Sequence, residues 1–381
     1  MRDSLVVSMI VVSVMAAAVQ RCGAQGASAP AVAAEPAAGA SPAAQVSEAR
    51  LMDTLRSLPT KRAPLGDDAH RAGLKETEQL LVRELRAMGY APTLQPFKWS
   101  VPGGVKPAEG KEITAADITY NNIIVDIPGT EFPNEVLIIS GHFDAVVNSP
   151  GADDDGTGTA AVIELARVFK DVKPRRTLRL ALFNLEEQGL VGSRAYVVEW
   201  VKRNKAAGGE EGDPDGTAPK PADPPTVPSV PSAPLTPREK IIGMVSLEML
   251  GYFSDAPNSQ KSPIKKIEGV FEAPTVGDTI VLVGIATHQK FSKKLAAAMQ
   301  AAAPDLKITA LDFMPIPIPD MMRSDHQPFI IAGQPAVMLT DTANFRNPNY
   351  HKPTDTIETI DAKRFTLVVK AVAGAAWELT R

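Results

Sequence analysis

The sequence predicts an α/β protein, a three-layer sandwich in which helices flank a mixed, mostly parallel central sheet. Apolar runs of strand length alternate with helical patterns along most of the chain, which is typical of sheets whose strands are joined by crossover helices. Several of these runs are apolar on both faces, as central strands must be when helices cover each side. Ligand sites in such folds lie beyond the carboxyl ends of the strands.

The first segment of the chain predicts export rather than a folded element. An apolar run from Leu5 to Val19 follows Arg2 and precedes small residues, so residues 1–22 are predicted to be a secretory signal peptide. The run is shorter than the roughly 20 apolar residues of a membrane-spanning helix, so an uncleaved anchor is the less favoured alternative. We expect a secreted or periplasmic protein with no membrane contact unless this segment is retained or lipidated.

The single cysteine near the N-terminus raises the question of lipidation. Cys22, the only cysteine, permits a lipoprotein interpretation, but Arg21 fits a small-residue lipidation signal poorly. If the signal is removed near there, the mature chain has no disulfide and no thiolate-bound metal.

Residues 23–46 consist mainly of Ala, Pro, Gly, Ser and Gln. Because these residues bury too little apolar surface to offset the entropy of ordering, we expect a flexible tether.

The folded domain is predicted to span residues 47–381 and to open with two helices, at 47–58 and 72–90. Apolar residues at helical spacing, such as Leu81 and Leu85, share one face of the second helix. The predicted strands are 93–99, 121–127, 135–141, 177–185, 241–250, 279–285 and 335–340. Helical patterns between and after these strands cover 158–172, 193–204, 288–303 and 361–379.

A proline-rich segment at about residues 206–237 interrupts this alternation. Its Pro, Gly and acidic residues have almost no apolar surface to bury. We predict a disordered insert on the surface, with a lid or a partner-docking segment as the alternative.

The overall charge limits the class of partner. A net charge of −4 and a pI near 5.8 give no global basic field. This argues against nucleic acid or an anionic membrane as the main partner and favours small or peptidic substrates.

Residues 151–158, GADDDGTG, place three consecutive aspartates between glycines. Carboxylates this close repel one another unless a cation or several hydrogen-bond donors neutralise them. A calcium loop of the D-x-D-x-D-G type is disfavoured because Gly151 and Val162 would occupy its first and twelfth positions, where oxygen ligands are needed. The run therefore requires a different cation or donor set.

Histidines and acids also follow several predicted strands at the point where each ends. A histidine with an acid two residues later, both on one face of an extended segment, is typical of a metal ligand and its supporting carboxylate. Imidazole and carboxylate ligands without thiolate suit zinc, cobalt or manganese. The side chains concerned are His142 and Asp144 after one strand, Glu186 and Glu187 after the next, Glu248 after another, and Tyr350 with His351 near the C-terminus.

The motifs GHFD, GADDDGTG, NLEEQGLVGSRAY, SLEMLGY, SDHQPF and TDTANFRNPNYHKPTDT, in this order, resemble the M28 family of co-catalytic dizinc peptidases, and in particular its bacterial aminopeptidase group. The resemblance extends from about residue 48 to 381, except for the proline-rich insert. It implies a fold of the zinc-dependent exopeptidase type, two Zn²⁺ per chain with Co²⁺ or Mn²⁺ as alternatives, and peptide substrates.

The resemblance also implies a set of metal ligands. His142 and Glu248 would complete one zinc site and Glu187 and His351 the other, while Asp154 would bridge both ions. Many family members have an aspartate at the position of Glu248, so metal preference could differ here. In this family the peptide bond that follows the bridging aspartate is often cis.

Roles for the remaining residues follow from the same resemblance. Glu186 would take a proton from the attacking water and pass it to the leaving amine. Tyr350 would donate a hydrogen bond to the oxyanion of the tetrahedral intermediate, and Asp144 would orient His142. We assign His326 a supporting or substrate-pocket role. Two further histidines are expected at the surface, namely His70 and His288.

The function predicted is release of N-terminal amino acids from peptides. A carboxypeptidase of the same family is one alternative and would use Arg323 or Arg346 to bind the terminal carboxylate of the substrate. A glutaminyl cyclase, which the family also resembles, is another. A non-catalytic, metal-stabilised binding domain is disfavoured because a structural metal site is closed by its ligands and has no use for Glu186.

Overall fold

The computed structural model describes residues 41–100, 118–206, 238–314 and 318–381, and the statements below concern these residues. The predicted signal peptide, residues 23–40 of the tether and residues 207–237 of the proline-rich insert lie outside the described residues. Within the described residues, no helix combines the length and the apolar character needed to cross a membrane.

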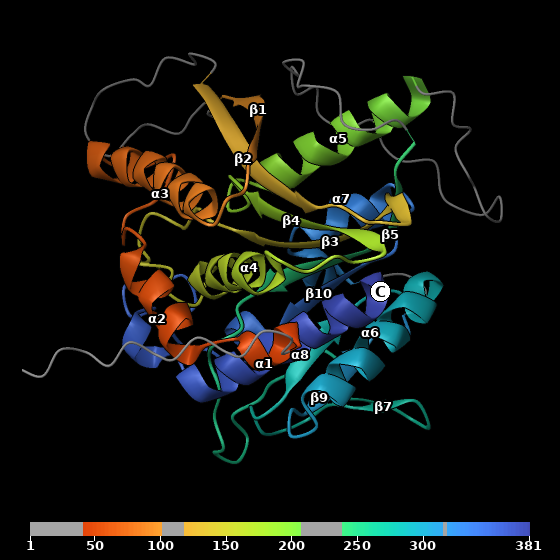
Figure 1. The fold of residues 1–381 in the computed structure, drawn as a ribbon. Helices are drawn as coiled ribbons and strands as arrows, with labels where there is room; N and C mark the ends of the chain where they lie inside the picture. Colours follow the sequence, from red (N-terminus) through yellow and green to blue (C-terminus); the bar gives the residue numbers. More distant parts are fainter. Residues whose placement is uncertain (1–40, 101–117, 207–237, 315–317) are drawn as a thin grey trace, which may run out of the picture. The chain divides into compact units, whose positions relative to one another are not determined.

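The core of the fold is an eight-stranded sheet with the order β1-β2-β4-β3-β5-β10-β8-β9 (Figure 1). Its central strands β4, β3, β5 and β10 run parallel, whereas β1–β2, β2–β4 and β10–β8 pair antiparallel. The mixed, mostly parallel sheet predicted from the sequence is thereby confirmed. The strands are β1 (Thr93–Trp99), β2 (Ile118–Ile127), β3 (Phe132–His142), β4 (Arg176–Phe183), β5 (Lys240–Glu248), β8 (Ile280–Val283), β9 (Ile308–Leu311) and β10 (Ala336–Thr340).

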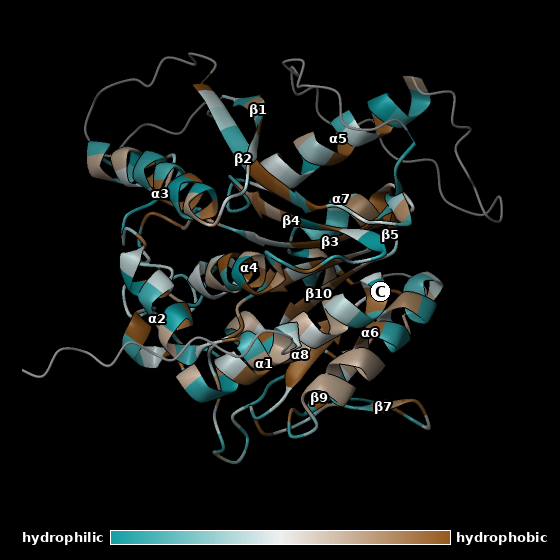
Figure 2. Cartoon of the chain, in the orientation of Figure 1, coloured by the Kyte–Doolittle hydropathy of each residue, from teal (hydrophilic) through white to brown (hydrophobic). Residues whose placement is uncertain are grey.

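Two layers of helices cover the sheet. On one face, α5 and α7 bury an apolar cluster that includes Phe183, Tyr196 and Phe329. On the other face, α4, α6 and α8 enclose a larger cluster, and hydrophobic colouring runs along β4 and β10 between the layers (Figure 2). The helices are α1 (Pro42–Gln45), α2 (Glu48–Ser57), α3 (Asp68–Ala87), α4 (Gly156–Phe169), α5 (Val191–Ala206), α6 (Gln289–Ala302), α7 (His326–Ile331) and α8 (Ala362–Thr380).

The sequence did not predict the outermost strand, β9, or the separate hairpin of β6 (Lys266–Ile267) and β7 (Phe271–Glu272). Of the β9 residues only Leu311 is buried, because an edge strand has a neighbour on one side alone. Such a strand lacks the long apolar run that marks the central strands.

The structure differs from the sequence prediction at two N-terminal positions. The expected tether extends to residue 46, yet α1 lies within it and Val46 is buried in the main core. His70 was expected at the surface but is 7% exposed. Its Nδ1 contacts Asp67 Oδ1 at 2.5 Å, and its Nε2 lies 2.8 Å from the carbonyl oxygen of Val147. The other surface candidate, His288, is half-buried at the start of α6.

Candidate metal centre

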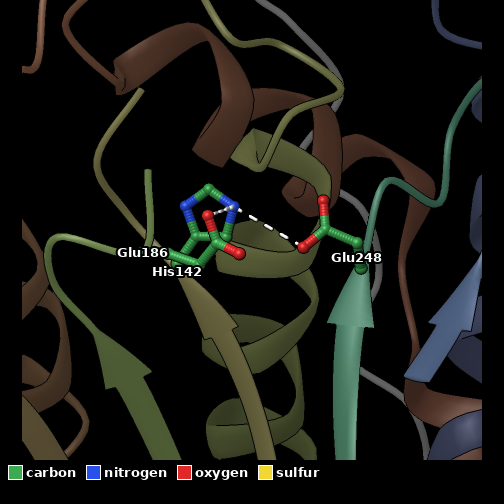
Figure 3. Close-up of side chains that lie close together, drawn as sticks. All are labelled: His142, Glu186 and Glu248. Atoms are coloured by element: carbon green, nitrogen blue, oxygen red, sulfur yellow. Dashed lines mark ion pairs between the residues drawn. The ribbon is translucent and has the colours of Figure 1, made fainter. Parts of the chain in front are cut away.

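His142 is the last residue of β3, and its ring lies at the carboxyl edge of the sheet (Figure 3). The side chain is 1% exposed, and neither ring nitrogen has a hydrogen-bond partner among the described residues. A buried imidazole without partners is unfavourable. Its Nε2 instead lies 3.9 Å from Glu186 Oε2 and 3.7 Å from Glu248 Oε2, an arrangement that suits a shared cation.

Asp154 lies between His142 and a second histidine. Its Oδ1 is 3.3 Å from His142 Nε2, and its Oδ2 is 3.0 Å from His351 Nε2. The same His351 nitrogen is 3.3 Å from Glu187 Oε2. The two oxygens of one carboxylate thus face two imidazoles, which is the arrangement a bridging ligand needs. The peptide bond between Asp154 and Asp155 is cis, as the family resemblance implies.

Two groups of side chains could each hold a metal ion. His142, Glu186 and Glu248 form one, and Asp154, Glu187 and His351 form the other, with ligand atoms within 4.8 Å of one another in each. Two atoms bound to one tetrahedral zinc at 2.0–2.2 Å are about 3.3–3.6 Å apart. The Asp154 contacts and the Glu187–His351 contact are at or slightly below this spacing. Glu186 lies furthest from His142.

Burial and the charges of neighbouring acids raise the pKa of the three glutamates of this centre. Burial, with the charges of neighbouring acids, raises the pKa of Glu186 and Glu248 well above the ordinary value. Burial and the charge of Asp154 raise the pKa of Glu187 to about 7. Burial alone would lower the pKa of His351, but hydrogen bonds to Asp154 and Glu187 raise it to about 10. Divalent cations would replace these protons, so the donor set fits a metal.

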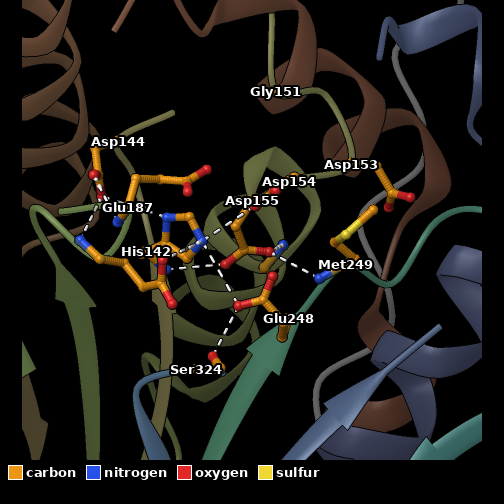
Figure 4. A network of polar contacts seen from close by, with 12 residues as sticks. His142, Asp144, Gly151, Asp153, Asp154, Asp155, Glu187, Glu248, Met249 and Ser324 are labelled. Carbon is orange, nitrogen blue, oxygen red and sulfur yellow. Dashed lines mark hydrogen bonds and ion pairs between the residues drawn. The ribbon is translucent and has the colours of Figure 1, made fainter. Parts of the chain in front are cut away.

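The three aspartates of the acidic run have separate functions (Figure 4). Asp155 caps α4 and accepts the N–H groups of His142 at 2.9 Å, Gly158 at 3.0 Å and Met249 at 3.2 Å. Asp153 accepts the N–H of Gly251 and the side-chain amide of Asn347. Only Asp154 directs both oxygens at histidines. The outer two acids therefore fix the backbone around the middle one.

Asp144 supports both groups at once. Its Oδ1 accepts the N–H of Glu186 at 3.0 Å, and its Oδ2 accepts the N–H of Glu187 at 3.2 Å. The same Oδ1 lies 3.4 Å from Nδ1 of His142. The structure thus places Asp144 where it can orient the imidazole ring and the turn that carries the two glutamates.

Several supporting residues were not found from the sequence. Ser324 Oγ donates to Glu248 Oε2 at 2.8 Å, and Asp355 accepts the N–H groups of Asp153 and Asp154. Both lie in motifs quoted above, SDHQPF and PTDT, but nothing in their spacing indicated these contacts. His326 in the first motif belongs to neither metal-binding group. Its Nε2 lies 2.8 Å from the carbonyl oxygen of Met321.

Tyr350 stacks on the ring of His351, with 3.8 Å between ring centroids and 21° between planes. Its hydroxyl accepts a hydrogen bond from Arg323 at 2.8 Å. Arg346 is 6% exposed and donates to Gln260 Oε1 and to main-chain carbonyl oxygens. Of the two arginines considered from the sequence, only Arg323 is therefore placed to meet a substrate.

A pocket that is open to solvent lies against the centre and is lined by Glu248, Tyr350 and Arg323. The structure brings it together from β8, β9, β10, the β6–β7 hairpin and the loop before α7. Its walls are largely apolar and include Phe271, Val281, Val283, Leu311, Met321 and Met338.

The sheet has the arrangement of the zinc-dependent exopeptidase fold, and the site brings together two groups of potential metal ligands. Comparison with known proteins identifies the family. The profile described as "Peptidase family M28" matches residues 122–208 and 237–376. The chain belongs to this family. Residues 209–236 fall between the two matched segments, within the predicted insert.

Individual relatives agree with this placement. The "Uncharacterized protein YfbL" of Escherichia coli (strain K12) is 28% identical over 278 residues, which are 70% of this chain and 74% of that protein. The zinc aminopeptidase BSAP from Bacillus subtilis has a TM-score of 0.60 at 16% identity, covering 88% of this chain and 96% of its own.

A glutaminyl cyclase from Porphyromonas gingivalis has a TM-score of 0.54, also at 16% identity, covering 88% of this chain and 99% of its own. The BSAP and cyclase likenesses are at identities that establish a shared fold alone, and the two proteins differ in activity. The reaction must therefore be argued from the site.

Proposed function

We propose that the protein is an exported aminopeptidase that binds two zinc ions and hydrolyses the first peptide bond of its substrates. The observation that carries this proposal is Asp154, whose two oxygens face His142 and His351 from opposite sides. Asp154 would be a ligand shared by the two sites. His142 and Glu248 would complete one site, and Glu187 and His351 would complete the other.

Bound zinc would supply Lewis acidity and lower the pKa of water toward neutrality. The protein's own residues would then control the movement of protons. Glu186 is buried at the sheet edge close to His142, and we assign it the role of a base beside the ions rather than that of a ligand. We expect it to accept a proton from water and to deliver that proton to the leaving amine.

Tyr350 would donate a hydrogen bond to the oxyanion that develops on the scissile carbonyl. Its hydroxyl oxygen accepts from Arg323, which leaves the phenolic proton free for the substrate. The stacking contact with His351 fixes the ring beside the second proposed ion site. The adjacent apolar pocket would receive the side chain of the residue that is released.

The charges of the site favour an amino terminus over a carboxyl terminus. Carboxylates predominate among the groups that could hold metal. Two cations, Arg323 and Lys261, line the pocket beside them. Arg323 already donates hydrogen bonds to Tyr350 and Asn344. A carboxypeptidase that uses Arg323 to bind the terminal carboxylate is the second candidate, because this guanidinium lines the pocket and donates to Tyr350.

Peptides with blocked termini distinguish an aminopeptidase from a carboxypeptidase. We expect purified protein to release amino acids from unblocked and C-amidated peptides, and not from N-acetylated ones. Cleavage of N-acetylated peptides with loss on C-amidation would establish the carboxypeptidase instead. Conversion of an N-terminal glutamine to pyroglutamate with loss of ammonia, while the peptide bond stays intact, would identify a cyclase.

The variant Glu186→Gln tests the proposed base. We expect kcat to fall by about 10²–10⁴-fold, the usual contribution of a general base, while metal analysis still finds two zinc ions per chain. Glu164→Gln is the matched control, because Glu164 is 2% exposed and pairs with Arg50 in α2. It should retain kcat. Undiminished kcat in Glu186→Gln would refute the assignment.

Export rests on the N-terminal sequence, with its apolar run from Leu5 to Val19. We expect protein recovered from the periplasm or medium of an expression host to lack residues 1–22. N-terminal sequencing measures this, and an intact Met1 on cytosolic protein would contradict it.

A further inference from the structure

Arg62 lies between α2 and α3 and is buried, with 2% of its surface exposed. Its guanidinium donates hydrogen bonds to four main-chain carbonyl oxygens. Nε donates to Phe143 at 3.0 Å, and the terminal nitrogens donate to Pro59 at 3.2 Å and to Pro150 and Gly151. Arginine suits such a position because its planar fork carries five donors in fixed directions.

Three of the four carbonyl groups that Arg62 binds, those of Phe143, Pro150 and Gly151, lie at the two ends of one loop. Phe143 directly follows His142, while Gly151 lies three residues before Asp154. The main chain reinforces both ends, since the N–H of Ala145 donates to the Arg62 carbonyl at 2.9 Å and the N–H of Gly156 donates to the Gly151 carbonyl at 3.0 Å. One side chain therefore connects the segments that carry His142 and Asp154.

The position of Arg62 is also electrostatically unusual. Burying a guanidinium is costly. Burial lowers the pKa of Arg62, and the carboxylates of Asp355, Asp154, Asp144 and Asp155 offset only part of that effect. These acids are ligands or supports of the metal centre. Arg62 is thus a buried cation close to the acids of the metal centre, although its own hydrogen bonds go to main-chain carbonyl groups.

We propose that Arg62 is a positioning residue that holds the loop of residues 143–151 so that His142 and Asp154 keep their mutual spacing before metal binds. This spacing is 3.3 Å between His142 Nε2 and Asp154 Oδ1. Through it, Arg62 sets the zinc affinity of the centre. The inference rests on the proposed metal centre and is independent of which peptide bond is cleaved.

The variant Arg62→Lys tests the inference, since lysine keeps the charge but cannot reach all four carbonyl groups. Zinc affinity of metal-free protein is measured by competition with a chromogenic chelator. We expect affinity to fall by about 10–100-fold, as when the supports of metal ligands are removed. Urea unfolding of the metal-free proteins is measured in parallel.

Arg179→Lys is the matched control. Arg179 on β4 is 1% exposed and binds Asp126, Glu239 and Tyr196, none of which contacts the centre. This variant should lose stability and keep its zinc affinity. If Arg62→Lys does not fold, Arg62→Gln, which retains two N–H donors, replaces it in the same comparison.

The inference is overturned if the Arg62 variant binds zinc as tightly as the unaltered protein, or if the Arg179 variant weakens binding equally. Unaltered protein that binds no zinc would overturn both this inference and the proposed function. A weakened Arg62 variant in a protein that hydrolyses no peptide would support the positioning role and reject the aminopeptidase.

Discussion

Glu187 and His351 must both lose protons before they can bind a metal ion. Burial and the charge of Asp154 raise the pKa of Glu187 to about 7. Hydrogen bonds to Asp154 and Glu187 overcome the effect of burial and raise the pKa of His351 to about 10. At pH 6 the metal-free centre therefore carries protons that it has partly lost at pH 8.

We accordingly expect zinc affinity to rise between pH 6 and pH 8, because protons compete with the ion for these two side chains. Chelator competition at several pH values measures this directly. Proton release on zinc binding, followed with a pH indicator in weak buffer, provides an independent control. An affinity that is constant over this range would contradict the interpretation of the site.

Ser324 supports Glu248 through a single hydrogen bond, which makes its contribution separable. Without its hydroxyl, the Glu248 carboxylate loses the donor at 2.8 Å that fixes Oε2. We expect Ser324→Ala to weaken zinc binding by about tenfold, the lower end for a residue that supports a metal ligand.

The matched control is Ser292→Ala. Ser292 is 1% exposed and also donates to a carboxylate, Asp312, away from the centre. Equal zinc affinities of the two variants, measured by chelator competition, would show that Ser324 does not position Glu248.

At the scale of elements, the strand ends explain why the sequence predicted so much of the site. His142 and Glu248 are the last residues of parallel strands, and Glu186 and Glu187 follow another. Parallel strands bring their carboxyl ends to one edge. The supporting residues have no such local signal. Ser324 is 76 positions from Glu248, and Arg62 is 81 positions from Phe143. Their contacts depend on tertiary packing, as does the burial of His70.

The pocket beside the metal centre is formed mainly by the strands at one end of the sheet, β10, β8 and β9. Val281 and Val283 come from β8, Leu311 from β9 and Met338 from β10, while Phe271 comes from the β6–β7 hairpin. No single stretch of sequence holds this wall, so the sequence could not predict the side chain it accepts. Under the proposed function, its apolar character favours a large apolar residue at the substrate's N-terminus.

Filling the pocket should reverse this preference. We expect Val283→Phe to lower kcat/KM for N-terminal Leu or Phe peptides by about 10–100-fold, the usual effect of a poor fit between a side chain and an apolar pocket. Peptides with N-terminal Ala should be cleaved as before, which provides the internal control. A uniform loss for all peptides would instead indicate damage to the centre.

For the whole molecule, the acids of the metal centre oppose folding, because the fold buries them close together. The three-layer sandwich buries Glu186, Glu248 and the acidic run at one edge of its sheet. Ligands that bind only the folded state stabilise it by about 4 kcal/mol at a thousandfold excess over Kd. Zinc should therefore act on global stability as well as on catalysis.

The raised pKa values determine whether the stability of the metal-free protein rises or falls with pH. Burial raises the pKa of Glu187 from 4.5 to about 7, so the folded state retains a proton that the unfolded chain has lost. Such a group stabilises the fold below pH 4.5, and this stabilisation is lost as the pH rises through 7. His351, whose pKa rises from 6.5 to about 10, acts in the same direction at higher pH.

We therefore expect the free energy of unfolding of the metal-free protein to fall from pH 5.5 to pH 8.5. Zinc replaces the protons and neutralises the acids, so the metal-loaded protein should lose much less stability over this range. Urea unfolding at three pH values, with and without zinc, measures both curves. Metal-free stability that holds constant or rises with pH would mean that other groups outweigh this centre, because its own contribution can only fall.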